Sequence, residues 1–330
     1  MDWDVILRIG LTALIGREVI LFALAAIGLN VHFGYTGLLN FGQVAFAAVG
    51  AYGIAIAVAT FGLSMWIGVA LGLLAAVVLA LLLGIPTLRL RADYLAIVTI
   101  AASEIIRFTL RSVSAREVTG GSFGLTQFAR DFYGVNPFPP GRYGTGFLQF
   151  SERDFWLLMV GWGLVALGTF VLFLLMRSPW GRVVKSVRED EDAARSLGKN
   201  VYSFKMQSLI FGGILGAFAG FIQAVGTQSV QPDFFATPIT FFAYVALIAG
   251  GTATLLGPIV GAMIFWSLLA LTDSLLRQAI SAGYIPTEIM SGTQIGQVRF
   301  MLVGLGLMLL MIYRPQGIFG DRREMAFDVR

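Results

Sequence analysis

The sequence predicts an all-α fold, a polytopic transmembrane bundle of about eight to ten helices that span or re-enter a membrane. Of its 330 residues, 57% are hydrophobic and 13% are charged, whereas about a quarter of an ordinary soluble domain is charged. The apolar residues form blocks, and several exceed the roughly 20 residues that cross a hydrocarbon core. The blocks lack the alternation of apolar and polar residues that barrel strands show, so we expect helices.

The first half of the chain contains four expected helices, at 14–33, 38–61, 64–85 and 94–110. A Gly-rich break separates the first two, and Pro86 ends the third because proline cannot continue a helix. The fourth helix is short and carries two opposite charges. A polar segment, 111–153, rich in Gly, Pro and aromatic residues, follows it.

The second half contains five more, at 155–176, 206–225, 241–249, 258–276 and 298–313. A charged stretch, 177–205, separates the fifth helix from the sixth, and Pro315 stops the ninth before the tail 314–330. The pattern leaves open whether 241–276 crosses the membrane twice or forms a re-entrant pair. We expect all of 1–330 to form one transmembrane domain.

The distribution of Lys and Arg predicts the orientation, because basic residues collect on the cytoplasmic side. The stretch 177–205 holds seven basic residues against four acidic ones, and the tail 314–330 holds four arginines, so both are expected to be cytoplasmic. The loop 87–93 falls on the same side, and 111–153 is then an external loop. The N-terminus is also expected to be external, and its acidic start does not indicate a removable signal peptide.

Several kinds of chemistry find no support in the sequence. Cysteine is absent and His32 is the single histidine, so we expect no disulfide, no thiolate metal site and no cluster of histidine ligands. The sequence shows no P-loop, nucleophile elbow or zinc-protease motif, so we expect neither catalysis nor a cofactor. The basic residues lie in loops, which fits membrane orientation better than nucleic-acid binding.

Five polar residues inside the expected spans are candidates for a functional or structural role. Asn40 and Gln43 are three residues apart, so they are expected to share a helix face beside a substrate path, or else to bond between helices at a tight turn. Glu104 and Arg107 have the spacing of an ion pair, either structural or part of the path. His32 fits a hydrogen-bonded structural group or an interface residue better than a proton relay.

Glycines at four-residue spacing recur within the expected helices. Gly212, Gly216 and Gly220 would lie on one face of the sixth helix. Close backbone contact is a main source of helix association in lipid, so we expect tight packing within the chain at this face.

The charged stretch has the pattern of one or two short amphipathic helices on the membrane surface. Acidic residues cluster at its centre, Ala193 and Ala194 favour a helix, and Gly198 is a natural helix end. A solvated loop is the alternative that composition leaves open.

Six parts of the sequence resemble the branched-chain amino-acid ABC transporter permeases, most of all the LivM-type subunit. The resemblance extends over about residues 21–320, and urea and short-amide permeases are similar throughout. The matching stretches are 34–43 (GYTGLLNFGQ), 91–99 (RADYLAIVT), 104–107 (EIIR), 188–194 (REDEDAA), 257–258 (GP) and 314–317 (RPQG).

The resemblance implies one half of an ATP-driven importer in a bacterial or archaeal plasma membrane. A homologous permease chain would complete the pathway, two cytoplasmic ATPases would dock beneath, and an external binding protein would deliver the solute. The implied solute is a branched-chain or other neutral amino acid, with a urea or short-amide permease as the alternative.

The acidic-Ala-Ala pattern that ends at Gly198 resembles the coupling motif of ABC importers, with Asp in place of the usual Glu. The resemblance therefore implies a set of residues that contact the ATPases: Arg182, Arg188, Glu189, Asp190, Glu191, Asp192, Ala193, Ala194 and Gly198.

Two further classes of function fit the residues alone. A stand-alone secondary transporter would also use broken helices and an intramembrane ion pair, but it would need no ATPase. A membrane scaffold without transport would give no reason for Asn40, Gln43 and Glu104 inside spans.

Overall fold

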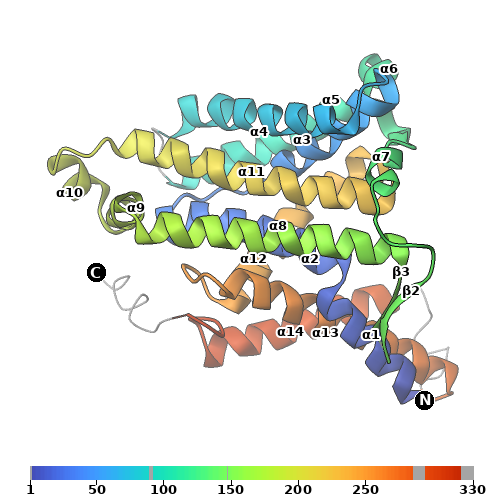
Figure 1. Cartoon of the computed structure of the whole chain (residues 1–330). Coiled ribbons are helices and arrows are strands. Elements are labelled where there is room, and N and C mark those ends of the chain that lie inside the picture. Colours follow the sequence, from blue (N-terminus) through green and yellow to red (C-terminus); the bar gives the residue numbers. More distant parts are fainter. Residues whose placement is uncertain (1, 89–91, 147, 285–293, 321–330) are drawn as a thin grey trace.

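The computed structural model describes residues 2–88, 92–146, 148–284 and 294–320. The main helices lie roughly side by side in a bundle, except that α1 lies at an angle at one end (Figure 1). They are α1 (Trp3–Ile15), α2 (Arg17–Leu29), α3 (Gln43–Ala55), α4 (Met65–Thr87), α5 (Ala92–Arg111), α8 (Glu152–Arg177), α11 (Val201–Thr227), α12 (Pro238–Gly250), α13 (Gly257–Ser281) and α14 (Ile295–Tyr313). Two π-helical turns, η1 (Asn30–Tyr35) and η2 (Ile56–Thr60), extend α2 and α3.

Within the described parts of the chain, eight helical runs are long and apolar enough to cross a membrane, which confirms the predicted polytopic helical class. These runs are 3–35, 43–60, 65–87, 152–177, 201–227, 232–250, 257–281 and 295–313. The helix α5 has 20 residues and packs against α3 and α4, but its charged and polar residues keep it outside this apolar set.

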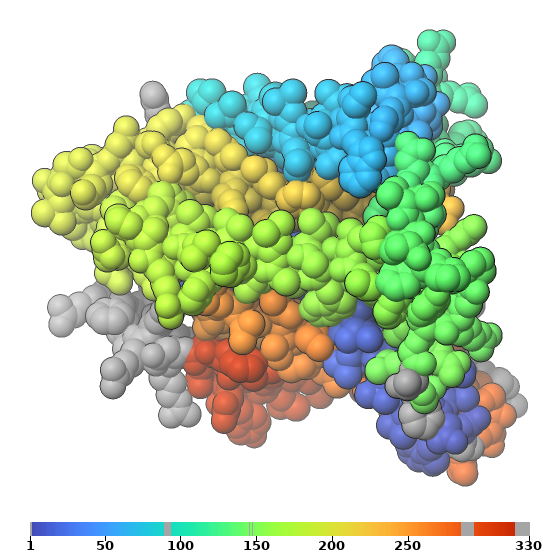
Figure 2. Space-filling view, in the orientation of Figure 1, coloured from blue at the N-terminus to red at the C-terminus, as the bar shows by residue number. Residues whose placement is uncertain are grey.

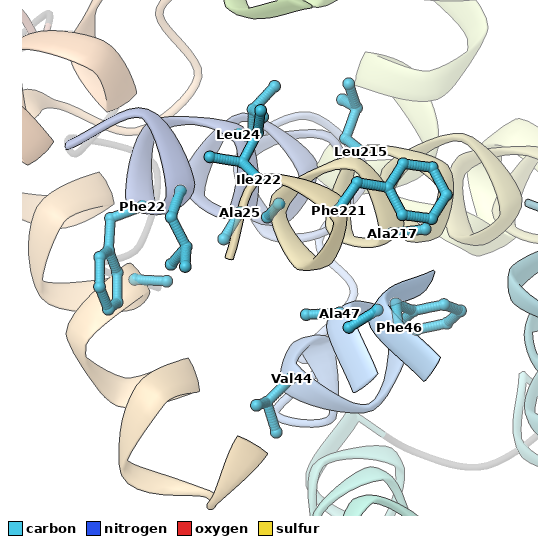
Figure 3. Close-up of a cluster of buried hydrophobic side chains, with 14 of the residues drawn as sticks. Phe22, Leu24, Ala25, Val44, Phe46, Ala47, Leu215, Ala217, Phe221 and Ile222 are labelled. Carbon is cyan, nitrogen blue, oxygen red and sulfur yellow. The ribbon is translucent and has the colours of Figure 1, made fainter. Parts of the chain in front are cut away.

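The centre of the bundle is formed by α2, α3 and α11, whose small and apolar side chains interlock (Figure 3). The glycine face of α11 packs as the sequence predicted. A Cβ added to Gly220 would lie 1.9 Å from the carbonyl oxygen of Ala47, and one added to Gly216 would lie 2.9 Å from Cβ of Phe46. The two helices are therefore so close that only glycine fits at this face.

The two ends of the bundle differ. At one end lie the start of α1 and the segment between α5 and α8, and at the other lie α9, α10 and the end of α14 (Figure 1). The space-filling view shows the segment around α10 projecting beyond the neighbouring helices (Figure 2). The short helices are η3 (Val113–Ala115), α6 (Arg116–Thr119), η4 (Gly121–Phe123), α7 (Arg130–Gly134), α9 (Pro179–Glu189), α10 (Glu191–Ser196) and η5 (Pro232–Phe235).

Two small antiparallel ladders organise the end that carries the 112–151 segment. The hairpin of β2 (Arg142–Thr145) and β3 (Leu148–Ser151) pairs Tyr143 with Phe150. The strand β1 (Leu125–Thr126) pairs with β4 (Ser229–Val230), which follows α11. The predicted polar loop is therefore an ordered cap that is tied to the turn between α11 and α12.

Several predicted boundaries are corrected by the structure. A helix, α1, precedes the first expected span, because Asp2 caps its N-terminus by accepting from the backbone N–H of Asp4. Pro86 lies inside the last turn of α4 rather than after it. The second span begins at Gln43 instead of residue 38, so Asn40 does not share a helix face with Gln43.

The region 241–276 forms two antiparallel helices that meet at the α9 end (Figure 1). With η5, α12 extends over 232–250, and both it and α13 have the length and hydropathy of membrane spans. This arrangement favours two crossings over a re-entrant pair. The predictions on Arg89, Arg91, Arg322, Arg323 and Arg330 lie outside the described residues.

Candidate functional site

The first broken segment lies between α2 and α3. The chain leaves α-helical geometry at Asn30, passes through η1, and is irregular over 37–42. Gly37 has φ +74, a left-handed conformation that glycine adopts without strain. An irregular backbone between apolar helices needs other partners for its polar groups, and side chains supply them here.

A fully buried polar network holds this segment in place. The Asn40 amide nitrogen lies 3.1 Å from Nδ1 of His32 and 3.4 Å from Oε1 of Gln43. Nε2 of His32 lies 3.2 Å from the carbonyl oxygen of Leu209, and Gln43 donates to the carbonyl oxygen of Gly212 at 3.0 Å. The network therefore joins the broken segment to α11, and it agrees with a structural role for His32.

Asn40 also organises the backbone around it. Its Oδ1 accepts from the N–H of Gly42 at 2.9 Å, and its carbonyl oxygen accepts from the Tyr244 hydroxyl of α12 at 2.9 Å. The N–H of Phe41 donates to Oγ1 of Thr99 in α5 at 3.0 Å. Four helices thus converge on this one irregular segment.

The second broken segment, 251–256, connects α12 with α13 and is clamped by a residue of the first. The side chain of Asn30 accepts from the N–H of Ala253 at 2.8 Å and donates to the carbonyl oxygen of Thr254 at 2.7 Å. Ala253 has φ +58, which costs a non-glycine residue roughly 1–2 kcal/mol. The side-chain amide of Asn30 therefore clamps this strained turn against the first broken segment. This role of Asn30 was not predicted from the sequence.

The predicted ion pair between Glu104 and Arg107 is present, and it belongs to a larger clasp. Arg107 donates from Nε to Oε2 of Glu104 at 2.8 Å and from Nη1 to Oδ1 of Asp233 at 2.9 Å. Oε1 of Glu104 accepts from the Thr237 hydroxyl at 2.5 Å. The clasp ties α5 to η5 and to the start of α12. The contacts of Asp233 and Thr237 were not predicted, because these residues lie more than a hundred positions from Glu104 and Arg107 in the sequence.

The charged stretch forms two short helices, α9 and α10. Ser178 caps α9, whose first residue is Pro179, and Oδ1 of Asp190 accepts from the N–H groups of Asp192 and Ala193, both at 2.9 Å. Gly198 has φ +75 just beyond α10, as its predicted place at a helix end requires.

Most of the residues implied to contact ATPases are exposed on these two helices. Ala194 instead lies buried against Val187 and Val201, which fixes α10 to α9 and to the start of α11. Lys205 pairs with Glu191, and Arg195 pairs with Asp192 at 2.7 Å. Leu197 is 78% exposed at the tip. The exposed residues are Arg182, Arg188, Glu189, Asp190, Glu191, Asp192, Ala193 and Gly198.

The helix α9 touches the first broken segment directly. Nζ of Lys185 lies 5.8 Å from the centre of the Tyr35 ring. A Cβ added to Gly37 would lie 3.5 Å from Cγ of Arg188. A movement of α9 would therefore displace Gly37. The polar network and the Asn30 side chain would pass that displacement on to both broken segments.

The predicted path residues do not line a common cavity within the described parts of the chain. Asn40 and Gln43 are enclosed at about 0% and 1% exposure, and Glu104 and Arg107 lie nearer the capped end. Three cavities of about 340, 530 and 580 Å³ are lined by other residues. In this conformation the four residues support the helices of the bundle.

The structure combines apolar spans with two broken segments that contact each other and with short charged helices at one end. This combination is typical of a multi-span membrane transport protein. Residues 12–312 match the family model described as the branched-chain amino acid transport system permease component. The chain belongs to this family of ABC transporter permeases, and it is a multi-pass inner-membrane protein.

Three relatives illustrate the similarity. The permease protein LivM of Escherichia coli K12 is 32% identical over 90% of this chain and 67% of its own length. A probable LivM of Methanocaldococcus jannaschii is 23% identical over 92% of this chain and 91% of its own length. LivH of Escherichia coli K12 is 26% identical over 91% of each. These relatives are high-affinity or probable branched-chain amino acid permease proteins.

Proposed function

We propose that the chain is the LivM-type permease subunit of an ATP-driven importer for branched-chain or other neutral amino acids. The names of its relatives support the solute class, and the family supports the ABC mechanism. The proposed partners are a homologous permease of the LivH kind, two cytoplasmic ATPases and an external solute-binding protein. ATP hydrolysis is assigned to the ATPases.

One observation supports the mechanism most directly: α9 abuts the first broken segment, and α10 packs on α9. We assign the α9 end to the cytoplasm, where α10 would dock on an ATPase through Leu197 and the exposed residues around it. ATP binding would move α9, and Lys185 and Arg188 would transmit that movement to Tyr35 and Gly37. The ATPases can shift the conformation only if they bind its two states with different affinity.

Within this mechanism, Asn40 and Gln43 are hinge supports. Gln43 bonds to α11, the Asn40 side chain bonds to His32 and to the N–H of Gly42 within the break, and Glu104 with Arg107 holds α5 to the start of α12. A rearrangement that opens a path between subunits has to break and remake some of these bonds. Their alanine variants are therefore expected to lower uptake at unchanged expression, and wild-type uptake in Asn40→Ala, Gln43→Ala and Glu104→Ala would reject this role.

The decisive experiment compares two exposed leucines at the α9 end. The variant Leu197→Asp places a charge at the tip of the proposed docking surface, whereas Leu256→Asp places it at the α12–α13 connection. The tagged chain is purified in mild detergent from cells that also express the neighbouring genes, and leucine uptake is measured in the same cells.

We expect ATPases and a second permease to co-purify with the wild type and with Leu256→Asp. With Leu197→Asp the ATPases and most of the uptake should be lost, while the second permease stays bound. Should the wild-type chain purify alone and still transport, it would be a stand-alone secondary transporter. Uptake of urea or a short amide in place of leucine would assign the alternative solute.

A further inference from the structure

A cavity of about 340 Å³ lies between α1, α2, α8, α11, α13 and α14, beside strand β3. It is close to the end of the bundle that carries the 112–151 segment, because Asp154 lies in the first turn of α8 and Arg299 in the second turn of α14. The volume is within the range of about 300–1,000 Å³ that small-ligand pockets occupy.

The walls of this cavity are amphipathic. Leu157, Leu158 and Leu269 form an apolar side. Arg17 and Glu18, which pair at 2.7 Å, lie at the kink between α1 and α2, and Asp154 and Arg299 add one charge of each sign. A ligand with a polar group and an apolar chain fits such a surface.

Two residues that line the cavity carry a buried donor with no hydrogen-bond partner among the described residues. These donors are Nε1 of Trp266 and Nε of Arg299. Arg299 uses another nitrogen, Nη1, to pair with Asp273 at 3.1 Å, which leaves Nε available. Buried donors in native proteins are nearly always satisfied by protein, water or ligand, and the adjoining cavity has room for an acceptor that a small rotation of the two side chains would reach.

The location favours a lipid as the source of that acceptor. The helix α14, which contributes Arg299, has the least buried apolar window of the spans found in the described chain, so one wall of the cavity belongs to a helix that faces the surrounding acyl chains. Tryptophan suits such a position, because its ring contacts lipid while its ring nitrogen donates to a polar group.

We propose that this cavity binds one phospholipid, whose phosphodiester or ester oxygens accept from Arg299 and Trp266 while an acyl chain lies along the three leucines. Asp154 would accept from a headgroup ammonium, so an ethanolamine headgroup fits best. The site is separate from the broken segments, and its occupation does not depend on the transported solute.

The test uses the full-length chain with any subunits that accompany it, and native mass spectrometry counts the phospholipids that remain after repeated detergent washes. Ala270→Trp fills the cavity from its α13 wall. Trp266→Phe removes only the donor and little volume, so it should fold even if the first variant does not. Leu268→Trp, on the exposed face of the same helix, is the matched control.

We expect one phosphatidylethanolamine to remain on the wild type and on Leu268→Trp, none on Ala270→Trp, and at least a tenfold lower occupancy on Trp266→Phe. Equal retention by wild type and Ala270→Trp, or no retained lipid on the wild type, would overturn the proposal.

A free amino acid shares the ligand chemistry, because it also carries acceptor oxygens and an apolar chain. Leucine is therefore added to the delipidated protein, and Trp266 fluorescence is followed with Trp266→Phe as the blank. A leucine response that Ala270→Trp abolishes, without lipid retention by the wild type, would assign the cavity to an amino acid and reject the lipid.

Discussion

At the scale of single residues, buried amides replace the hydrogen bonds that helices give up at the two breaks. Asn30 and Gln43 bond to backbone atoms of other elements, and the side chain of Asn40 accepts from the N–H of Gly42 in the irregular segment. Because apolar surroundings offer no water to the irregular backbone, each amide satisfies groups that would otherwise be unpaired. The breaks are therefore specified structures rather than gaps between helices.

Replacing Asn30 tests the clamp between the breaks. Asn30→Leu leaves the N–H of Ala253 and the carbonyl of Thr254 without their side-chain partner, at a cost of about 1–3 kcal/mol for each buried group. We expect a clearly lower midpoint of thermal denaturation in detergent. Asn200→Ala, which removes an exposed helix cap, is the control and should cost at most about 1 kcal/mol. An Asn30→Leu protein as stable as the wild type would show that the clamp contributes nothing.

The clasp at Glu104 allows a double-mutant cycle. Thr237→Val removes the donor hydroxyl of the 2.5 Å hydrogen bond and Glu104→Gln removes the charge of its acceptor, so the two changes together should cost less than the sum of the single changes. We expect a coupling energy of about 1–3 kcal/mol in unfolding free energy, as for hydrogen bonds to charged groups. The pair Glu104→Gln and Thr169→Val, whose side chains belong to α5 and α8, should be additive.

Residue spacing predicted some of these contacts and missed others. The pairing of Glu104 with Arg107 follows from helical spacing alone. The partners Asp233 and Thr237 depend on how α5 packs against α12, which no local pattern encodes. Asn30 lies in an apolar run, and its role depends on the turn at Ala253, far away in the sequence.

At the scale of elements, α9 and α10 illustrate how local signals set short helices. The proline, caps and terminal glycine of 178–198 lie where helix rules place them. The structure confirmed two helices, as the charged pattern had allowed. The contact of α9 with Tyr35 was not predictable, because it depends on tertiary packing.

The N-terminal cap of α10 allows the stability of this helix to be tested. Asp190→Ala removes the acceptor for two N–H groups and should destabilise α10 by about 1 kcal/mol, which raises its open population about fivefold. Trypsin cleavage after Arg195 should accelerate by the same factor. Asp190→Asn keeps a capping oxygen and should be cleaved like the wild type, and equal rates for all three proteins would contradict the assigned cap.

Helix boundaries were predicted well for five of the nine expected helices. The third, fourth, fifth, seventh and ninth match α4, α5, α8, α12 and α14 within three residues at each end. Residues 38–42 look apolar enough to begin a helix, yet the hydrogen bonds of Asn40 to His32 and Gly42 keep them irregular. Hydropathy predicts that a segment is buried, but it does not predict its backbone conformation. Residues 38–42 are an example, because they lie within the bundle without being helical.

At the scale of the whole molecule, the distinct ends of the bundle should face opposite sides of the membrane. The absence of cysteine makes this directly measurable, since a single introduced cysteine has no background. In intact spheroplasts, an impermeant maleimide should label Ser122→Cys, in η4 of the cap, and should leave Ser196→Cys, in α10, unlabelled until the membrane is permeabilised. The reverse pattern would invert the proposed orientation.

The end of α12 has a consequence for the order in which this protein matures in the cell. The carbonyl oxygens of Ala249 and Gly250 accept from the N–H groups of Ile318 and Phe319, which the ribosome synthesises only after α13 and α14. Until these residues have been synthesised, the carbonyl oxygens of Ala249 and Gly250, beside the turn that Asn30 holds, lack these hydrogen-bond partners. An inserted chain that still lacks Ile318 and Phe319 would therefore expose this turn to quality-control proteases, and the synthesis of these two residues would close the bundle.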